Sequence, residues 1–254
     1  MTAEVDIRAA RRPTWRMLGA EWRTVGEGVQ AFIGRDEYRS WPKGDGHPVL
    51  VIPGFLAGPA STRYLRGLLR YLGYRTYDWG LGVNLGVREG LQETLEHRLV
   101  DLAVKRGRSV SIIGWSAGGI YAREIARAHP EVVRQVITMG SPIRGDHEQT
   151  RAWRLYRRMN AGTLTDDLMS EAARAARAEP LSVPTTCIYS RSDGIVAWQL
   201  CTSEAAPQTE NVEVHSSHLG YGHQRETLWV VADRLAQPEG EWSPFVAPDR
   251  SGRR

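Results

Sequence analysis

Hydrophobic and polar residues follow one another along the chain in blocks that predict strands and helices in turn. The continuous apolar run Val49–Ile52 ends at a Pro-Gly pair, which is typical of a strand buried on both faces. Leucines at helical spacing between Val87 and Lys105 predict an amphipathic helix that ends at Gly107. The same criteria predict strands at 74–79, 110–113, 132–139, 185–189 and 212–215, and helices at 62–72, 117–128 and 225–235.

This alternation of strands and helices predicts an α/β fold: a mainly parallel sheet with helices on both faces. The insertion 143–184 departs from the alternation and holds two helix-like stretches, 148–159 and 164–178, that are rich in Arg and Ala. Because ligands bind at the carboxyl ends of the strands in such sheets, we interpret the insertion as a helical cap or lid. A crossover helix pair without a gating role is the alternative.

Before the first strand, apolar residues recur every three or four positions between Thr14 and Ile33. They are Trp15, Leu18, Trp22, Val25, Val29 and Phe32. This pattern predicts a helix whose apolar face packs on the main body of the protein. The predicted organisation is therefore an N-terminal helical extension (1–46), a main α/β domain (47–238) and a C-terminal tail (239–254).

The composition narrows the class of protein. Hydrophobic residues make up 41% of the chain, and no apolar run reaches the length of about 18 residues that a membrane span needs, so we expect a soluble protein. The first residues mix acids with arginines and lack the apolar block of a secretory signal, which favours a cytoplasmic location. Cys187 and Cys201 are too few for a disulfide framework and are expected to be free thiols.

The basic residues raise the question of a charged partner. The net charge is +4, and all but two of the 33 basic residues are arginines. These arginines are spread along the chain among acids, and no nucleic-acid-binding motif accompanies them, so we expect no nucleic acid partner. Arg151, Arg154, Arg157 and Arg158 fall within the insertion. The sequence leaves open whether they face a substrate or water.

A G-x-S-x-G motif centred on Ser116 supplies the first candidate for chemistry. It stands between the predicted strand 110–113 and the predicted helix 117–128, where the motif places a serine in a sharp turn. Gly114 and Gly118 allow this turn because a Cβ at either position would collide across it. The amide dipoles of the following helix favour negative charge at the turn. Ser116 is therefore the candidate nucleophile, with a helix N-cap as its structural alternative.

A serine nucleophile needs a base, and the base needs a carboxylate that orients it. In this topology the acid follows the next-to-last strand, which is the position of Asp193 after the predicted strand 185–189. Asp193 is therefore the candidate acid, with a turn-forming Asp-Gly pair as its structural alternative. Asp166 and Asp167 are competing carboxylates, less well anchored because they lie inside the insertion.

The base is expected in the loop between the last strand and the last helix. Three histidines occupy that stretch: His215, His218 and His223. His215 ends the predicted strand and His223 stands at the start of the helix, whereas His218 lies in mid-loop among small neighbours. His218 is the preferred base, and His223 is the main alternative.

Acyl transfer also needs two backbone N–H groups directed at the developing oxyanion. One is expected from Ala117, the residue after the nucleophile, and the other from the loop 53–58 after the first strand. Phe55 is the preferred donor in that loop, and Leu56 is the alternative. Because the chain has no phosphate-binding loop, dinucleotide fingerprint or metal-ligand spacing, we expect no cofactor and no metal.

Four stretches together resemble the lipase- and esterase-like members of the α/β-hydrolase superfamily. They are Pro53–Phe55, Gly114–Gly119, Tyr189–Val196 and Ser217–Gly220, within a resemblance that extends from about Pro48 to Gln237. The resemblance implies the α/β-hydrolase fold and hydrolysis of carboxylic esters through an acyl-enzyme with a Ser116-Asp193-His218 triad. The expected substrate is a small-molecule or lipid ester.

Two other functions are alternatives to this prediction. A non-catalytic α/β-hydrolase scaffold could bind a ligand or a partner. A lipid hydrolase could act at a membrane surface, with the N-terminal helix and the Arg-rich insertion docking on anionic lipid. Thioester, lactone and amide cleavage would use the same arrangement of residues as ester cleavage.

Overall fold

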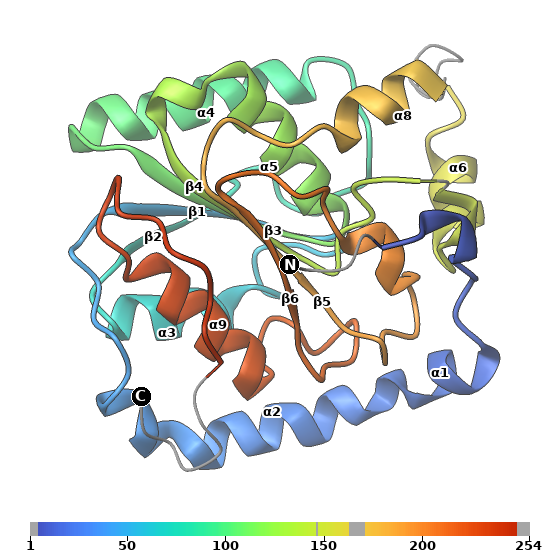
Figure 1. Cartoon of the computed structure of the whole chain (residues 1–254), viewed down its shortest axis with the longest axis horizontal. Coiled ribbons are helices and arrows are strands. Elements are labelled where there is room, and N and C mark those ends of the chain that lie inside the picture. The colour runs from blue at the N-terminus through green and yellow to red at the C-terminus, as the bar shows by residue number, and fades with distance from the viewer. Residues whose placement is uncertain (1–4, 146, 163–170, 248–254) are drawn as a thin grey trace.

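Six strands form a single sheet in which every neighbouring pair is parallel, in the order β2-β1-β3-β4-β5-β6 (Figure 1). The computed structural model describes residues 5–145, 147–162 and 171–247. The strands are β1 (Pro48–Ile52), β2 (Arg75–Asp78), β3 (Val110–Trp115), β4 (Val133–Met139), β5 (Thr185–Tyr189) and β6 (Thr209–Glu213). Because they are all parallel, their carboxyl ends meet at one edge of the sheet.

The burial of each strand follows its place in the sheet. Every residue of β1, β3, β4 and β5 is buried, which agrees with the continuous apolar sequence of β1 and with the apolar residues of the other three strands. The edge strands β2 and β6 are half-exposed. The predicted strand 212–215 is therefore misplaced, since β6 begins at Thr209 with polar residues that a search for apolar runs overlooks.

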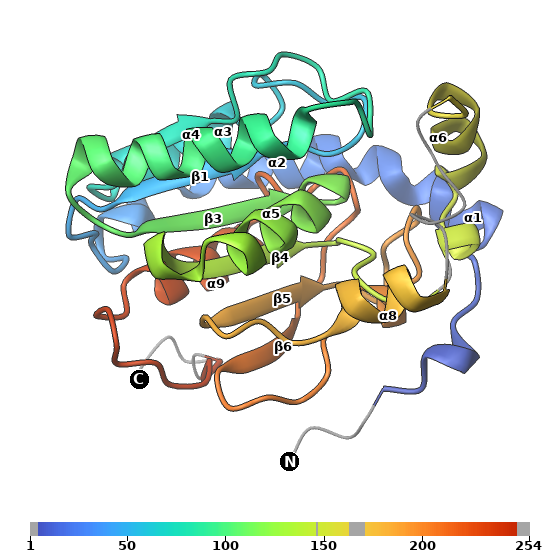
Figure 2. The ribbon, with the colours of Figure 1, turned by 90° about the horizontal axis from the view of Figure 1, so that it is seen from above.

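Helices cover both faces of the sheet (Figures 1 and 2). One face packs against α4 (Leu91–Arg106) and α5 (Ala117–Ala128), and the other packs against α3 (Arg63–Tyr71) and α9 (Arg225–Leu235). Each face has its own buried apolar core, and the two cores share no residue. The layered arrangement leaves the carboxyl edge of the sheet to the loops.

Two predicted helices differ from the observed ones in a way that shapes this edge. The helix predicted from Val87 begins only at Leu91, after Gly90, whose φ of 69° is left-handed, so residues 87–90 form a loop. Within the insertion, the helix predicted at 148–159 is the 3-10 turn η5 (His147–Gln149) followed by α6 (Trp153–Met159). The second predicted helix appears as α8 (Glu171–Ala178), and Asp166 and Asp167 lie outside the described residues.

The N-terminal extension packs on the main body with the opposite face to the one predicted. It consists of α1 (Trp15–Gly19), η2 (Ala20–Arg23) and α2 (Thr24–Ile33), followed by η3 (Gly34–Arg39). Glu21 is buried, whereas five of the six apolar residues of the predicted inner face are more than half exposed: Trp15, Trp22, Val25, Val29 and Phe32. The predicted inward orientation of this apolar face is wrong, because polar partners on the main body bind the other side of the segment.

Short 3-10 turns complete the described elements: η1 (Ile7–Ala9), η4 (Pro130–Val132) and η6 (Trp198–Cys201). Cys187 and Cys201 are buried free thiols, as predicted. Among the helices of the described ranges, none combines the length and the apolar character needed to cross a bilayer.

Candidate active site

Ser116 occupies a strained turn between β3 and α5. Its φ of 54° and ψ of −124° lie outside the regions that L-residues ordinarily adopt. A Cβ on Gly114 would overlap Gly119, and a Cβ on Gly118 would overlap the carbonyl of Ile52, so both positions require glycine. The Ser116 N–H donates to the Met139 carbonyl at 2.8 Å, which ties the turn to the end of β4. These contacts hold the Ser116 side chain at the carboxyl edge of the sheet.

The structure brings Ser116, His218 and Asp193 into one hydrogen-bonded chain. Ser116 Oγ lies 3.0 Å from His218 Nε2, and His218 Nδ1 lies 2.7 Å from Asp193 Oδ2. The other Asp193 oxygen accepts the backbone N–H groups of Ile195 and Val196, each at 2.8 Å. Asp193 and His218 are both buried. This arrangement can transfer a proton from the Ser116 hydroxyl to His218.

The surroundings of His218 favour its charged form. Burial of the ring opposes protonation, but the charge and hydrogen bond of Asp193, together with the charge of Glu21, outweigh it and raise the pKa of His218 above 6.5. The Trp115 indole N–H donates to the His218 carbonyl at 3.1 Å. Trp115, inside the G-x-S-x-G motif, thus connects the nucleophile turn to the histidine loop.

The other two candidate histidines lie away from Ser116. His223 Nε2 lies 3.0 Å from the hydroxyl and 2.9 Å from the carbonyl of Thr24, so its ring is bound to the N-terminal extension. His215 is exposed, and its N–H donates to the Glu226 carboxylate. Of the three histidines, only His218 bonds to the candidate nucleophile.

The loop after β1 lies directly against the nucleophile turn. A Cβ placed on Gly54 would come within 3.2 Å of the Ser116 Cβ. The Leu56 N–H already donates to the Asn84 carbonyl at 2.7 Å. Of the two candidate oxyanion donors in this loop, Phe55 is therefore favoured over Leu56. The Asn84 side chain donates to the Pro53 carbonyl at 2.9 Å. Buried Asn84 thus fixes this loop, and no sequence motif had marked it.

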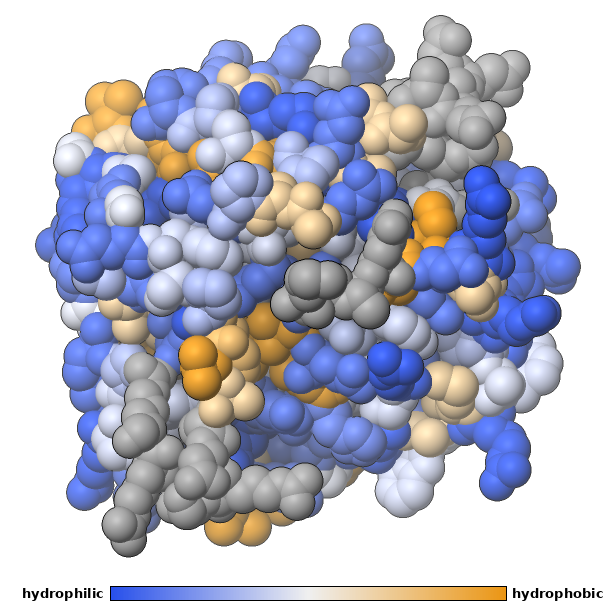
Figure 3. Space-filling model, in the orientation of Figure 1, coloured by the Kyte–Doolittle hydropathy of each residue, from blue (hydrophilic) through white to orange (hydrophobic). Residues whose placement is uncertain are grey.

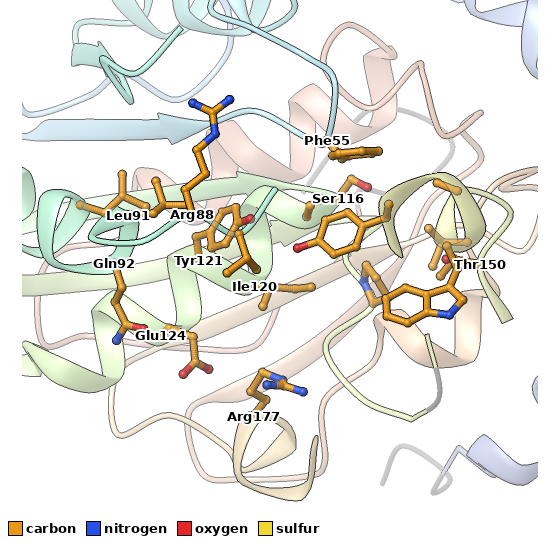
Figure 4. A pocket seen from close by; sticks show the side chains of 18 of the residues that line it. Phe55, Arg88, Leu91, Gln92, Ser116, Ile120, Tyr121, Glu124, Thr150 and Arg177 are labelled. Carbon is orange, nitrogen blue, oxygen red and sulfur yellow. The ribbon is translucent and has the colours of Figure 1, made fainter. Parts of the chain in front are cut away.

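An apolar cavity of about 230 Å³ opens beside Ser116. Ser116 and Phe55 stand on one side of it, and Gln92, Glu124 and Arg177 stand on the other (Figure 4). Between them the walls are mainly apolar and aromatic, with contributions from Val87, Leu91, Ile120, Tyr121, Trp153 and Tyr156. The insertion therefore covers the cavity through α6 and α8, as a cap would.

The arginines of α6 do not line this cavity. Arg154, Arg157 and Arg158 are exposed. Arg151 donates to the Pro13 carbonyl at 2.7 Å and lies 4.0 Å above the Trp15 ring. They face water or the N-terminal extension, which answers the question that the sequence left open.

Two acidic residues of the N-terminal extension bind the loops that carry Asp193 and His218. The buried Glu21 carboxylate accepts the backbone N–H groups of Gly194, His218 and Leu219 at 2.7, 3.0 and 3.0 Å. Glu27 accepts the Ser217 N–H at 2.9 Å. One carboxylate, Glu21, thus joins the acid loop to the histidine loop.

Arg23 adds a second link between the same two loops. Its guanidinium donates to the carbonyls of Ser192 and Ser216 at 2.7 and 3.0 Å. Sequence reasoning missed Glu21, Arg23 and Glu27, because their partners lie more than 160 residues away along the chain. These three residues stand between the periodic apolar positions, as the polar residues of any amphipathic helix do, so no local signal marked them.

Within the described residues, no three His, Cys, Asp or Glu side chains gather in a way that could hold a metal ion.

The chain is similar in structure to several hydrolases. Aspergillus fumigatus lipase B gives a TM-score of 0.60 at 18% identity. The match covers 80% of this chain and 55% of that lipase. A structure described with the metagenome-derived lipolytic enzymes LipS and LipT gives 0.56 at 16% identity, covering 76% of this chain and 93% of that one. The α/β hydrolase MGS-MChE2, from the metagenome of Mar Chica lagoon sediments in Morocco, gives 0.51 at 18% identity, covering 75% and 91%.

No protein-family model and no curated protein matches the sequence. The structural similarities define the fold: the chain has the fold of the α/β-hydrolase superfamily. The fold class predicted from the sequence is therefore confirmed.

Replacing Glu21 by Gln is expected to lower the pKa of His218. A negative charge near the ring stabilises the imidazolium, so its removal favours the neutral ring. NMR titration of the His218 ring protons measures this pKa in the wild type and in the variant.

Glu27→Gln is the matched control. It also removes a carboxylate bound to the histidine loop, but Glu27 is not among the charges that act on His218. Equal shifts in the two variants, or no shift in either, would contradict the role assigned to the Glu21 charge.

Proposed function

We propose that this chain is a serine hydrolase that cleaves carboxylic esters through an acyl-enzyme. The observation that carries the proposal is the unbroken Ser116-His218-Asp193 chain of hydrogen bonds beside an apolar cavity. A serine–histidine–carboxylate chain activates a hydroxyl that is otherwise a poor nucleophile, because the histidine accepts the hydroxyl proton and the carboxylate orients the histidine.

In the first half-reaction, Ser116 Oγ attacks the ester carbonyl carbon while His218 Nε2 accepts the hydroxyl proton. Asp193 keeps Nδ1 protonated and stabilises the imidazolium that forms. The backbone N–H groups of Phe55 and Ala117 stabilise the oxyanion of the tetrahedral intermediate. The C–O bond to the alcohol then breaks, His218 returns its proton to the departing alcohol, and the acyl group stays on Ser116.

In the second half-reaction, water attacks the acyl-enzyme and gives up a proton to His218. The second tetrahedral intermediate collapses, and the Ser116–acyl bond breaks. His218 then returns the proton to Ser116 Oγ, and the carboxylic acid is released. Asp193 favours the imidazolium that forms in each half-reaction, since, against the opposing effect of burial, its charge and hydrogen bond raise the pKa of His218.

The apolar cavity beside Ser116 supports the proposal that the substrate is an ester with an apolar acyl group, either a small molecule or a lipid. Its volume of about 230 Å³ lies below the roughly 300–1,000 Å³ of pockets for drug-sized ligands, so we infer a short or medium acyl chain. The buried free thiols Cys187 and Cys201 fit a reducing compartment, and a cytoplasmic location remains part of the proposal.

Ser116→Ala is expected to reduce kcat/KM for a p-nitrophenyl ester by about 10⁴- to 10⁶-fold, because the nucleophile is lost while the cavity persists. Covalent labelling by a fluorophosphonate probe should disappear in the same variant.

Ser40→Ala is the control, because Ser40 is an exposed serine whose hydroxyl only donates to the Glu37 carbonyl. It should keep both turnover and labelling. If Ser116→Ala hydrolyses the ester as fast as the wild type, the proposal fails and a ligand-binding scaffold becomes the better description.

Ile120→Trp tests whether the cavity holds the acyl chain. The larger side chain would fill the space beside Ser116 and exclude long acyl chains. The kcat/KM for p-nitrophenyl octanoate, divided by that for p-nitrophenyl acetate, should therefore fall about tenfold or more. Val104→Trp, on the exposed side of α4, is the matched control and should leave the ratio unchanged. An unchanged ratio in Ile120→Trp would place the acyl chain elsewhere.

A further inference from the structure

The N-terminal extension carries a row of exposed apolar side chains along its outer side. The face of the molecule in Figure 3 is mostly hydrophilic, with its orange side chains in small separate patches. Within residues 14–33, by contrast, six large apolar side chains are at least 52% exposed: Trp15, Trp22, Val25, Val29, Phe32 and Ile33. We call these six residues the outer apolar face. The six residues belong to α1, η2 and α2. The helices α1 and α2 run along one side of the protein (Figure 1).

The charges of this segment are sorted between its two sides. Glu21 and Glu27, its only acidic residues, turn inward and accept N–H groups of the catalytic loops. Arg16, in contrast, is exposed. The outer side of residues 14–33 therefore combines apolar and basic side chains with no acidic one.

Arginines stand over the aromatic rings at both ends of the outer apolar face. Arg151 lies 4.0 Å from the centre of the Trp15 ring, and Arg35 lies 4.0 Å from the centre of the Phe32 ring. Positive charge is thus held next to the apolar surface at each end.

Beyond Ile33 a groove of about 760 Å³ continues this surface. Arg35, Arg39 and Arg63 line it, together with Asp36, which is paired with Arg39 at 3.6 Å. The groove therefore keeps a surplus of positive charge.

We propose that the outer apolar face, with the arginine-lined groove beside it, docks on an anionic lipid bilayer. A helix that lies in the membrane interface places apolar residues, tryptophan above all, among the acyl chains and headgroups. Basic residues at the same level attract anionic headgroups. The outer side of residues 14–33 carries no acidic side chain, and Asp36 in the groove is paired with Arg39. This charge distribution matches an anionic occupant, because unpaired acidic side chains would be repelled by it.

The docking surface adjoins the candidate active site. Leu219, which follows His218 and is bound through its N–H to Glu21, is 43% exposed. The segment that docks is therefore the one whose inner side holds the histidine loop. Docking on lipid does not depend on the proposed function. The further idea that the bound lipid supplies an ester substrate rests on it.

Vesicle sedimentation of the full chain tests the proposal. The Ser116→Ala protein is used, so that binding is measured without any hydrolysis of the vesicles. It should bind phosphatidylcholine vesicles containing about 30% phosphatidylglycerol, bind pure phosphatidylcholine more weakly, and be released by about 0.5 M NaCl. No binding to the anionic vesicles at low salt would overturn the proposal.

Two sets of substitutions locate the surface. Trp22→Ser, Val29→Ser and Phe32→Ser combined should weaken binding about tenfold or more, because the apolar contact is lost. Arg16→Gln with Arg35→Gln, which leaves the apolar residues in place, should weaken binding to anionic vesicles alone. Val104→Ser with Val246→Ser, both also highly exposed, is the matched control and should bind like the parent protein.

Two results would contradict the assignment of this surface. One is unchanged binding in both the apolar and the arginine variants. The other is a protein that sediments as a dimer in solution and becomes a monomer in the apolar variant, since the occupant would then be a second copy of the chain. Hydrolysis of a soluble p-nitrophenyl ester by the same variants with Ser116 restored reports on the proposed function separately.

Discussion

The strained turn at Ser116 is the constraint on which the rest of the site depends. In the described part of the chain, only Ser116 and Leu56 adopt a positive φ without being glycine, and both lie at the candidate active site. Such a conformation costs on the order of 1–3 kcal/mol and persists only where the surroundings enforce it. Here Gly114 and Gly118 let neighbouring backbone come close enough to do so. The parallel sheet then brings the loops after β1, β5 and β6 to the same edge.

The parts of the site that could be predicted from the sequence are those with a local pattern. Ser116 is marked by its motif, and Asp193 and His218 by their places after successive strands. The structure brings these three side chains together. Position along the chain could not separate Phe55 from Leu56 as the amide donor. The distinction depends on the Leu56 N–H bond to Asn84, a long-range contact that no local pattern reveals.

The N-terminal extension shows a limit of periodicity as a guide to packing. A helical period of apolar residues predicts two unlike faces, and the usual assumption buries the apolar one. Here the polar face is buried instead, because the backbone N–H groups of Gly194, His218 and Leu219 need acceptors and Glu21 supplies them. An unpaired buried N–H group is costly, and the single Glu21 carboxylate satisfies three N–H groups at once.

This orientation has a consequence for both sides of the segment. Because Glu21 joins the acid and histidine loops and Glu27 binds the histidine loop, the opposite side is left with apolar residues and Arg16. The same placement of two carboxylates therefore positions His218 and removes negative charge from the outer surface. Glu21 lies on the same short segment as the outer apolar face, and its carboxylate is bound to the backbone of His218 and Leu219. The segment that carries the exposed apolar residues is therefore also a direct support of the histidine loop.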